Sequence, residues 1–356
     1  MVKVGSGAFE VSRDEVAATY FGSTRSVADL YAKATNGAVA VSGSVFGPYT
    51  VDSPASTCDV AAWSSEARDA ALTAGDDLSG YTHLAFLFPR VDACPWAGLA
   101  DPDGNESYIN APARGDVGLY HAAHELGHNL GAGHANGLRC SVDGAPVAIA
   151  DNACTYEDYS DPYSLMGMGV ARRPSAWDLS KMSLIDESAV STVDAATRRT
   201  IELTPVGGDG DGTQLLVIRR ASAGFLLLEY ARSGGPYDPL AEWETPNGGV
   251  VVRYVRHLED MDSALVDGRP ATSSFRDAAL FEGHSMSDAG LEIAVIRAGT
   301  TSATVELRDP GVNVARAPMP PTQPREFQAA MNSDSTVTLS WLPPSADSTV
   351  ARYRLY

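Results

Sequence analysis

The stretch that decides the fold of this chain reads HELGHNLGAGH, from His124 to His134. On a helix, residues i and i+4 project from the same face, so the imidazoles of His124 and His128 would lie one turn apart. The helix must end near Gly131, because glycine accepts the left-handed backbone that lets a chain turn sharply. The pattern therefore predicts that the turn brings His134 back to the other two imidazoles.

Three histidines in this arrangement are the ligand set of a catalytic zinc site. Zinc takes imidazole nitrogens at about 2.0–2.1 Å, and three protein ligands leave a fourth position for water or substrate. Glu125 follows the first histidine, and from there its carboxylate can take a proton from water at the ion. We expect His124, His128 and His134 to bind one Zn²⁺ and Glu125 to act as the general base. We interpret His121, one turn before His124, as a packing or supporting residue.

A methionine-containing segment supports this interpretation. It reads DYSDPYSLMG, from Asp158 to Gly167. Together with the zinc motif, it resembles the gametolysin-like metallopeptidases, a branch of the metzincins. The resemblance implies that Met166 packs beneath the three histidines as an apolar floor. Some metzincins place a tyrosine two residues after this methionine as a switchable metal ligand. Here that position is Met168, so no such tyrosine is expected.

The resemblance implies a secreted zinc endopeptidase that acts on protein or peptide substrates. Two alternatives stay open. A zinc amidase would use the same centre on a non-peptide substrate, whereas an adhesin-like protein would keep an inactive zinc site while its β domains bind a matrix. The intact Glu125 argues against the inactive protein. We expect a monomer from which the signal peptide and any pro-segment have been removed.

Charge and hydropathy argue against other partners. The chain has 45 acidic and 26 basic residues, with a formal net charge of −19. Phosphates of nucleic acids and of anionic membranes would be repelled by such a surface. No apolar run reaches the roughly eighteen residues typical of a transmembrane helix. We therefore expect neither nucleic acid nor membrane as a partner.

Four cysteines add a redox expectation. Secretion, which the resemblance implies, permits disulfides. Sequence order favours the pairs Cys58–Cys94 and Cys140–Cys154 among the three pairings that four cysteines allow. Reduced, buried thiols are the alternative.

The segment before the histidine helix suggests two further sites. Residues Glu106–Asn110 read as a strand, and in metzincins the strand at this place is an edge strand that pairs with the substrate. Ser107, Tyr108, Ile109 and Asn110 are therefore candidates for substrate contact. Just upstream, Asp101–Glu106 alternates oxygen-bearing residues with a glycine, as part of a Ca²⁺ loop does. A plain acidic turn is the alternative there, and also at Asp209–Gly212.

The predicted fold class is an α+β (α/β) catalytic domain of metzincin type followed by an all-β, sandwich-like domain. We place the catalytic domain at residues 1–188 and the β domain at 189–312, where short strand-like runs alternate with Gly, Pro and Asp. A proline-rich linker follows at residues 313–323. Residues 324–356 resemble the first strands of a fibronectin type III domain with Trp341 as its core tryptophan. Three strands cannot close such a sandwich, so we expect a truncated domain.

The later β region also carries part of the resemblance. Residues 226–230, LLLEY, and 248–254, GGVVVRY, are similar to the region that follows the catalytic domain in gametolysin-like and immune-inhibitor-A-like secreted peptidases. No catalytic constellation is evident in this region.

Overall fold

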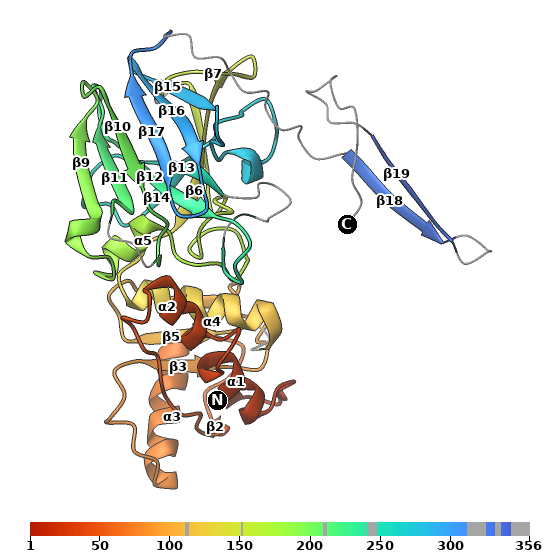
Figure 1. Ribbon diagram of the computed structural model, residues 1–356. Helices are drawn as coiled ribbons and strands as arrows, with labels where there is room; N and C mark the ends of the chain where they lie inside the picture. The colour runs from red at the N-terminus through yellow and green to blue at the C-terminus, as the bar shows by residue number, and fades with distance from the viewer. Residues whose placement is uncertain are drawn as a thin grey trace. The chain divides into compact units, whose positions relative to one another are not determined.

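Figure 1 shows the computed structural model of the chain, which divides into two units, residues 1–312 and 313–356. The structure describes residues 1–110, 114–150, 152–208, 212–238, 240, 248–311, 325–331 and 336–342. The predicted linker at residues 313–323 lies outside these residues, as does most of Asp209–Gly212.

Polar side chains explain where several helices begin. Ser12, Ser26 and Ser175 each accept a hydrogen bond from a backbone amide in the first turn of the helix that follows. Such bonds satisfy amides that have no partner within the helix. The α-helices are α1 (Arg13–Phe21), α2 (Val27–Ala34), α3 (Val60–Ala74), α4 (Gly115–Asn129) and α5 (Ala176–Lys181), and the 3-10 helices are η1 (Glu187–Ala189) and η2 (Phe275–Asp277).

Two small sheets accompany the helices of the first half. β1 (Val2–Val4) and β2 (Tyr49–Val51) pair in parallel. The second sheet has the order β3-β5-β4, with bounds β3 (Leu84–Leu87), β4 (Gly98–Ala100) and β5 (Glu106–Ile109). β5 is parallel to β3 and antiparallel to β4. The expectation that β5 is an edge strand is therefore wrong, because β5 lies between β3 and β4, which form the two edges.

An eight-stranded sheet takes strands from both halves of the chain. Its order is β7-β6-β14-β13-β12-β11-β9, and β8 also pairs with β6. β6 starts directly after His134, and its parallel neighbour β14 comes from the later β region. The boundary between two domains at residues 188 and 189 stays a prediction. The eight-stranded sheet contains strands from both sides of that boundary. The strands are β6 (Ala135–Val142), β7 (Ala145–Pro146), β8 (Cys154–Glu157), β9 (Val190–Asp194), β11 (Leu215–Arg219), β12 (Phe225–Arg232), β13 (Gly248–Val255) and β14 (Ser263–Val266).

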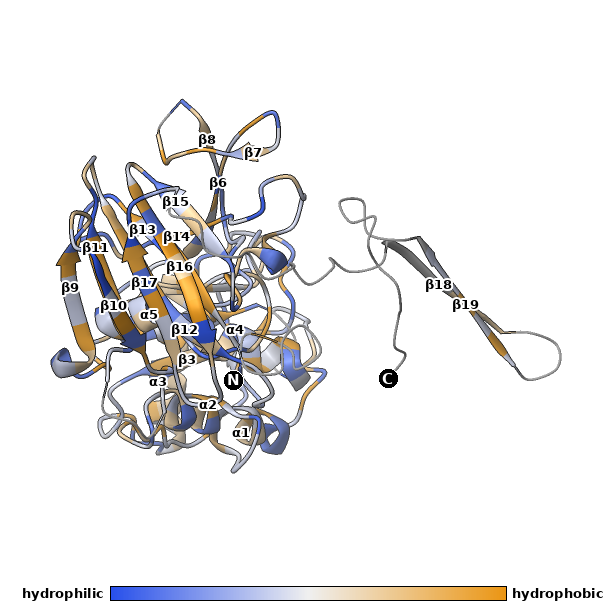
Figure 2. Ribbon diagram, turned by 45° about the horizontal axis from the view of Figure 1, so that its top comes forward, coloured by the Kyte–Doolittle hydropathy of each residue, from blue (hydrophilic) through white to orange (hydrophobic). Residues whose placement is uncertain are grey.

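A four-stranded sheet of order β10-β17-β16-β15 lies beside the larger one. Leu203, Ile293 and Val305 of this sheet share one buried core with Leu216 and Leu228 of the eight-stranded sheet. Figure 2 shows the apolar residues along β16 that contribute to this core. The strands are β10 (Arg199–Leu203), β15 (Ser285–Asp288), β16 (Leu291–Ala298) and β17 (Ala303–Arg308).

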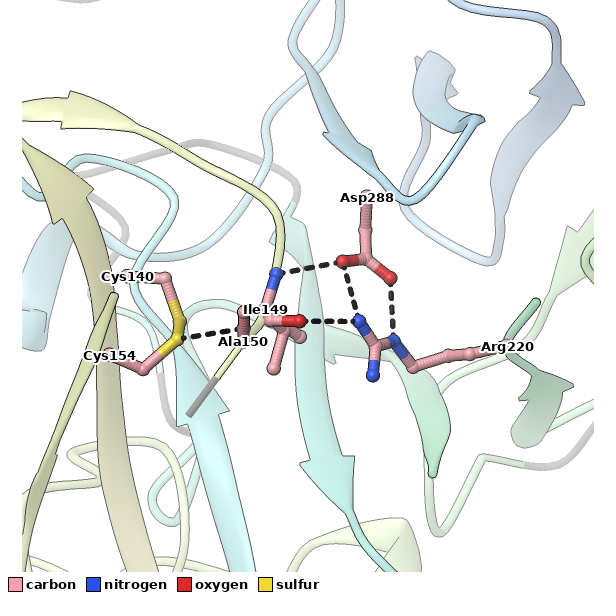
Figure 3. The surroundings of a disulfide bond; sticks show 6 residues. All are labelled: Cys140, Ile149, Ala150, Cys154, Arg220 and Asp288. Atoms are coloured by element: carbon pink, nitrogen blue, oxygen red, sulfur yellow. Dashed lines mark hydrogen bonds and ion pairs between the residues drawn. A yellow bond between two sulfur atoms is a disulfide. The ribbon is translucent and has the colours of Figure 1, made fainter. Parts of the chain in front are cut away.

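A buried ion pair links the two larger sheets, as Figure 3 shows. The guanidinium of Arg220, which follows β11, bonds both carboxylate oxygens of Asp288 on β15, at 2.6 and 2.9 Å. The backbone of Ile149 is bound between them, since its amide donates to Asp288 and its carbonyl accepts from Arg220. The loop that Cys140 and Cys154 close is thereby attached to both sheets.

The described part of the second unit is one antiparallel pair, β18 (Arg325–Met331) and β19 (Val337–Leu342). Its relation to a fibronectin type III domain stays a prediction. Across the described residues, strands account for more of the chain than helices do, in agreement with the expected β-rich region. None of the helices in these residues has the length and apolar character needed to cross a membrane.

Candidate metal centre and active site

Helix α4 carries the first two histidines and the glutamate of the motif. His124, Glu125 and His128 are all buried. The helix ends at Asn129, and Gly131 has a φ of 105°, in the left-handed region. The predicted helix, its end and the turn at Gly131 are thus confirmed.

One nitrogen from each of the three imidazoles lies close to the other two. Each histidine offers a nitrogen, and these three atoms all lie within 4.8 Å of one another. Nε2 of His124 and Nε2 of His128 are 3.1 Å apart. The opposite nitrogens are already bound, because Nδ1 lies 3.0 Å from the Leu165 carbonyl oxygen in His124 and 2.8 Å from that of Ala132 in His128. A carbonyl only accepts, so Nδ1 carries the hydrogen and each Nε2 has a free lone pair for a metal.

The electrostatics favour neutral histidines. Burial, followed by the proximity of His128, lowers the pKa of His124 to about 3. Burial also lowers the pKa values of His128 and His134. Neutral imidazole is the form that binds metals. The donor set therefore fits Zn²⁺ in number, chemical type and protonation.

Glu125 lies at the boundary between α4 and strand β4. Its carboxylate fills the space that a Cβ on Gly98 would occupy. Burial raises the pKa of Glu125 to about 8. A carboxylate in such surroundings is a stronger base than one in water, and a nearby cation favours its charged form.

Met166 lies fully buried against the opposite side of α4. A Cβ built on Gly127 would approach the Met166 sulfur to 2.6 Å, so only glycine leaves room for this side chain. The carbonyl of Met166 accepts a hydrogen bond from the amide of Ala135, which follows the third histidine. The methionine segment and His134 are thereby held together.

The four candidates for substrate contact are placed differently from what the sequence suggested. Ser107 and Ile109 are buried in β5, whose backbone pairs with β3 on one side and β4 on the other. The side-chain amide of Asn110 makes hydrogen bonds to the backbone of Val91, Cys94 and Trp96. The Tyr108 ring stacks on those of Phe86 and Phe88. β5 has no free edge for a substrate strand.

Two residues beside the third histidine were not predicted from the sequence as functional. The phenol oxygen of Tyr159 is 2.8 Å from Nε2 of His134. The expectation concerned only position 168, which is a methionine, whereas Tyr159 comes from seven residues before Met166. The second candidate is Asp262, which accepts a hydrogen bond from the His134 amide at 2.6 Å. The only sequence signal was that Tyr159 belongs to the methionine segment.

The other predicted sites have clear outcomes. Both disulfides, Cys58–Cys94 and Cys140–Cys154, are confirmed. Among the residues that the structure describes, the three histidines are the only group of three or more His, Cys, Asp or Glu side chains arranged to hold a metal ion. Asp101–Glu106 forms no such group, and the Asp101 carbonyl instead accepts a hydrogen bond from the Asn129 side chain. A calcium site has no support.

The comparison with protein families agrees with this geometry. Residues 8–183 match the family model described as gametolysin peptidase M11. With the three histidines, the match supports a metallopeptidase family for this part of the chain and a metal that is most simply zinc. A peptidase of this kind binds protein or peptide substrates. No curated protein matches the chain.

Proposed function

We propose that this chain is a secreted zinc-dependent endopeptidase of metzincin type, with Glu125 as its general base. The convergence of three histidine nitrogens beside a buried carboxylate carries the proposal. A zinc ion held by His124, His128 and His134 would lower the pKa of a water toward 7 and polarise the carbonyl of the scissile bond.

The protein residues supply the remaining chemistry. Glu125 takes the proton of the attacking water, and after attack it delivers that proton to the leaving amine. Burial raises the pKa of Glu125 and a neighbouring cation opposes this shift, so the carboxyl can accept and return a proton near neutral pH. Met166 packs against helix α4, which carries two of the histidines, so we expect little reorganisation during the reaction.

Strand β4 offers a place for the substrate. Within the described residues, β4 pairs only with β5, which leaves its other edge free. An extended peptide can add to such an edge through backbone hydrogen bonds. Because Gly98 of β4 touches Glu125, a peptide on this edge would lie beside the general base.

The two disulfides are typical of proteins in an oxidising compartment and support secretion. For the remaining chain we propose an accessory β domain at residues 189–312, related to the corresponding part of immune-inhibitor-A-like peptidases. Residues 324–356 would be the start of a fibronectin type III domain, and the protein would act as a monomer.

Digestion of a denatured protein tests the proposal. The zinc-loaded protein should cleave it, whereas Glu125→Gln should retain the zinc and lose at least about 10²-fold in rate. A chelator should abolish cleavage, and zinc should restore it. Glu10→Gln is the matched control, since the Glu10 side chain is exposed. If the protein binds zinc but cleaves nothing, the proposal is contradicted. The two alternatives, a zinc amidase and an inactive zinc-binding protein, would then remain.

A further inference from the structure

Tyr159 lies beside the three histidines, and the proposed mechanism gives it no role. Its phenol oxygen lies 2.8 Å from Nε2 of His134, and its ring centroid is 4.2 Å from that of His134 and 6.2 Å from that of His124. The side chain is 46% exposed, unlike the buried His124 and His128. The tyrosine therefore covers the histidines from the solvent side.

The distances are close to, and slightly shorter than, those between atoms that share one ion. Donors about 2.0–2.1 Å from a tetrahedral zinc lie roughly 3.3 Å from one another. Nε2 of His124 and Nε2 of His128 are 3.1 Å apart, and the Tyr159 oxygen is 2.8 Å from Nε2 of His134. The phenol oxygen thus lies closer to its neighbouring histidine nitrogen than the two helical histidine nitrogens lie to each other, at a distance that also suits a hydrogen bond.

The backbone around Tyr159 is built to hold this position. Tyr159 has a φ of 53°, a left-handed conformation that is costly for a residue with a side chain. The side chain of Asn136 compensates, because its oxygen accepts from the Tyr159 amide at 3.0 Å. The nitrogen of the same side chain donates to the His134 carbonyl at 3.3 Å. Asn136 is buried and fixes the tyrosine to the third histidine.

We propose that Tyr159 is a fourth metal-binding residue, whose phenol oxygen occupies the position that three histidines leave open. This inference rests on the proposed metal site, and it adds a form of regulation to it. A site closed by a protein ligand binds its metal more tightly and admits water or a substrate carbonyl only in competition with the phenol.

Copper binding tests the inference without reference to activity. Cu²⁺ binds strongly to sites of nitrogen and oxygen ligands, and a coordinated phenolate gives it a charge-transfer band in the visible. The metal-free protein loaded with one equivalent of Cu²⁺ should show this band, and Tyr159→Phe should lack it. Tyr156→Phe should keep it, since Tyr156 is an exposed tyrosine on the adjacent strand β8.

Further readouts make the outcome decisive. The ligand-field absorption of histidine-bound copper should persist in Tyr159→Phe, which shows that the variant folds and keeps its histidines. The zinc dissociation constant of Tyr159→Phe should rise by about 10-fold or more, whereas that of Tyr156→Phe should not change. Absence of the band from the wild type, or its persistence in Tyr159→Phe, would overturn the inference.

The inference and the proposed function fail in different ways. If the wild type shows the band but digests no protein, Tyr159 is a ligand and the proposed peptidase function is wrong. If the wild type digests protein without showing the band, the peptidase function holds and the ligand role of Tyr159 is wrong.

Discussion

Gly98 of strand β4 touches the carboxylate of Glu125 on helix α4, and no room for a side chain remains between them. The pair joins the edge of a sheet to the proposed general base. Any atom added at Gly98 must displace either the strand or the carboxylate, so the position of the base depends on a glycine outside the zinc motif.

The first prediction follows from this contact. Gly98→Ala should lower kcat/KM by about 10²-fold, because displacing a catalytic group by about 1 Å can cost that much. The zinc content should stay the same, since the histidine nitrogens do not contact Gly98. Peptide hydrolysis and metal analysis of the purified variant check both statements.

Gly80→Ala is the matched control, because a Cβ at Gly80 would have nothing within 4 Å. It should hydrolyse peptide at the wild-type rate. Full activity of Gly98→Ala would show that Glu125 tolerates displacement and that its contact with β4 has no catalytic role.

The second prediction concerns the contact between Gly127 of α4 and the buried Met166. Gly127→Ala should improve helix propensity by about 1 kcal/mol, yet we expect a net loss of about 1–3 kcal/mol of stability. The reason is that the new methyl group would overlap the Met166 sulfur. Urea unfolding with the metal chelated measures the change without a contribution from metal binding.

A double variant isolates this contact. If overlap with Met166 is the cause, Gly127→Ala combined with Met166→Ala should lose less stability than the sum of the single variants. Strict additivity would show that the cost arises elsewhere, for example at the hydroxyl of Tyr31, the other close neighbour of Gly127.

The sequence predicts those parts of the site that depend on local spacing. The helix with His124 and His128, and its end at Gly131, follow from periodicity and from the conformations open to glycine. The edge strand could not be predicted, since three residues at Gly98–Ala100 have no alternating pattern. Tyr159 could not be predicted either, because its place depends on the hydrogen bond that its amide donates to Asn136, 23 residues away in the chain.

The third prediction concerns the joint between the methionine segment and the β region. Arg253 of β13 is buried and bonds Asp161 at 2.6 Å and Glu229 of β12 at 2.8 Å. Arg253→Met should cost about 3–5 kcal/mol, because it leaves two carboxylates buried without their cation. Urea unfolding at neutral pH measures this loss.

Two comparisons separate charge from packing at this joint. Adding Asp161→Asn and Glu229→Gln to Arg253→Met should recover much of the loss, since no unpaired charge then stays buried. Arg219→Met removes an exposed partner of Asp194 and should change stability by no more than about 1 kcal/mol. A loss in Arg253→Met as small as in Arg219→Met would argue against a structural role for the buried ion pairs.

The fourth prediction is a pH dependence at Asp178, which is buried at the start of α5. Burial raises its pKa to about 6, although Arg253 and hydrogen bonds from Ser164 and Ser175 act in the opposite direction. In the unfolded chain the same carboxyl titrates near 3.9. Between about pH 4 and 6 the folded state therefore binds more protons, so this group's contribution to stability falls as the pH rises through that window.

Asp178→Asn removes that titration and gives the test. The stability of the wild type minus that of Asp178→Asn should fall by up to about 3 kcal/mol between pH 4 and pH 7. Urea unfolding of both proteins at each pH measures the difference, in which the titrations of all other carboxyls cancel. Asp69→Asn alters an exposed carboxyl, so its difference from the wild type should change much less over this range. If the Asp178 difference rose with pH instead, its carboxylate would be stabilised in the folded state, and the hydrogen bonds from Ser164 and Ser175 would outweigh its burial.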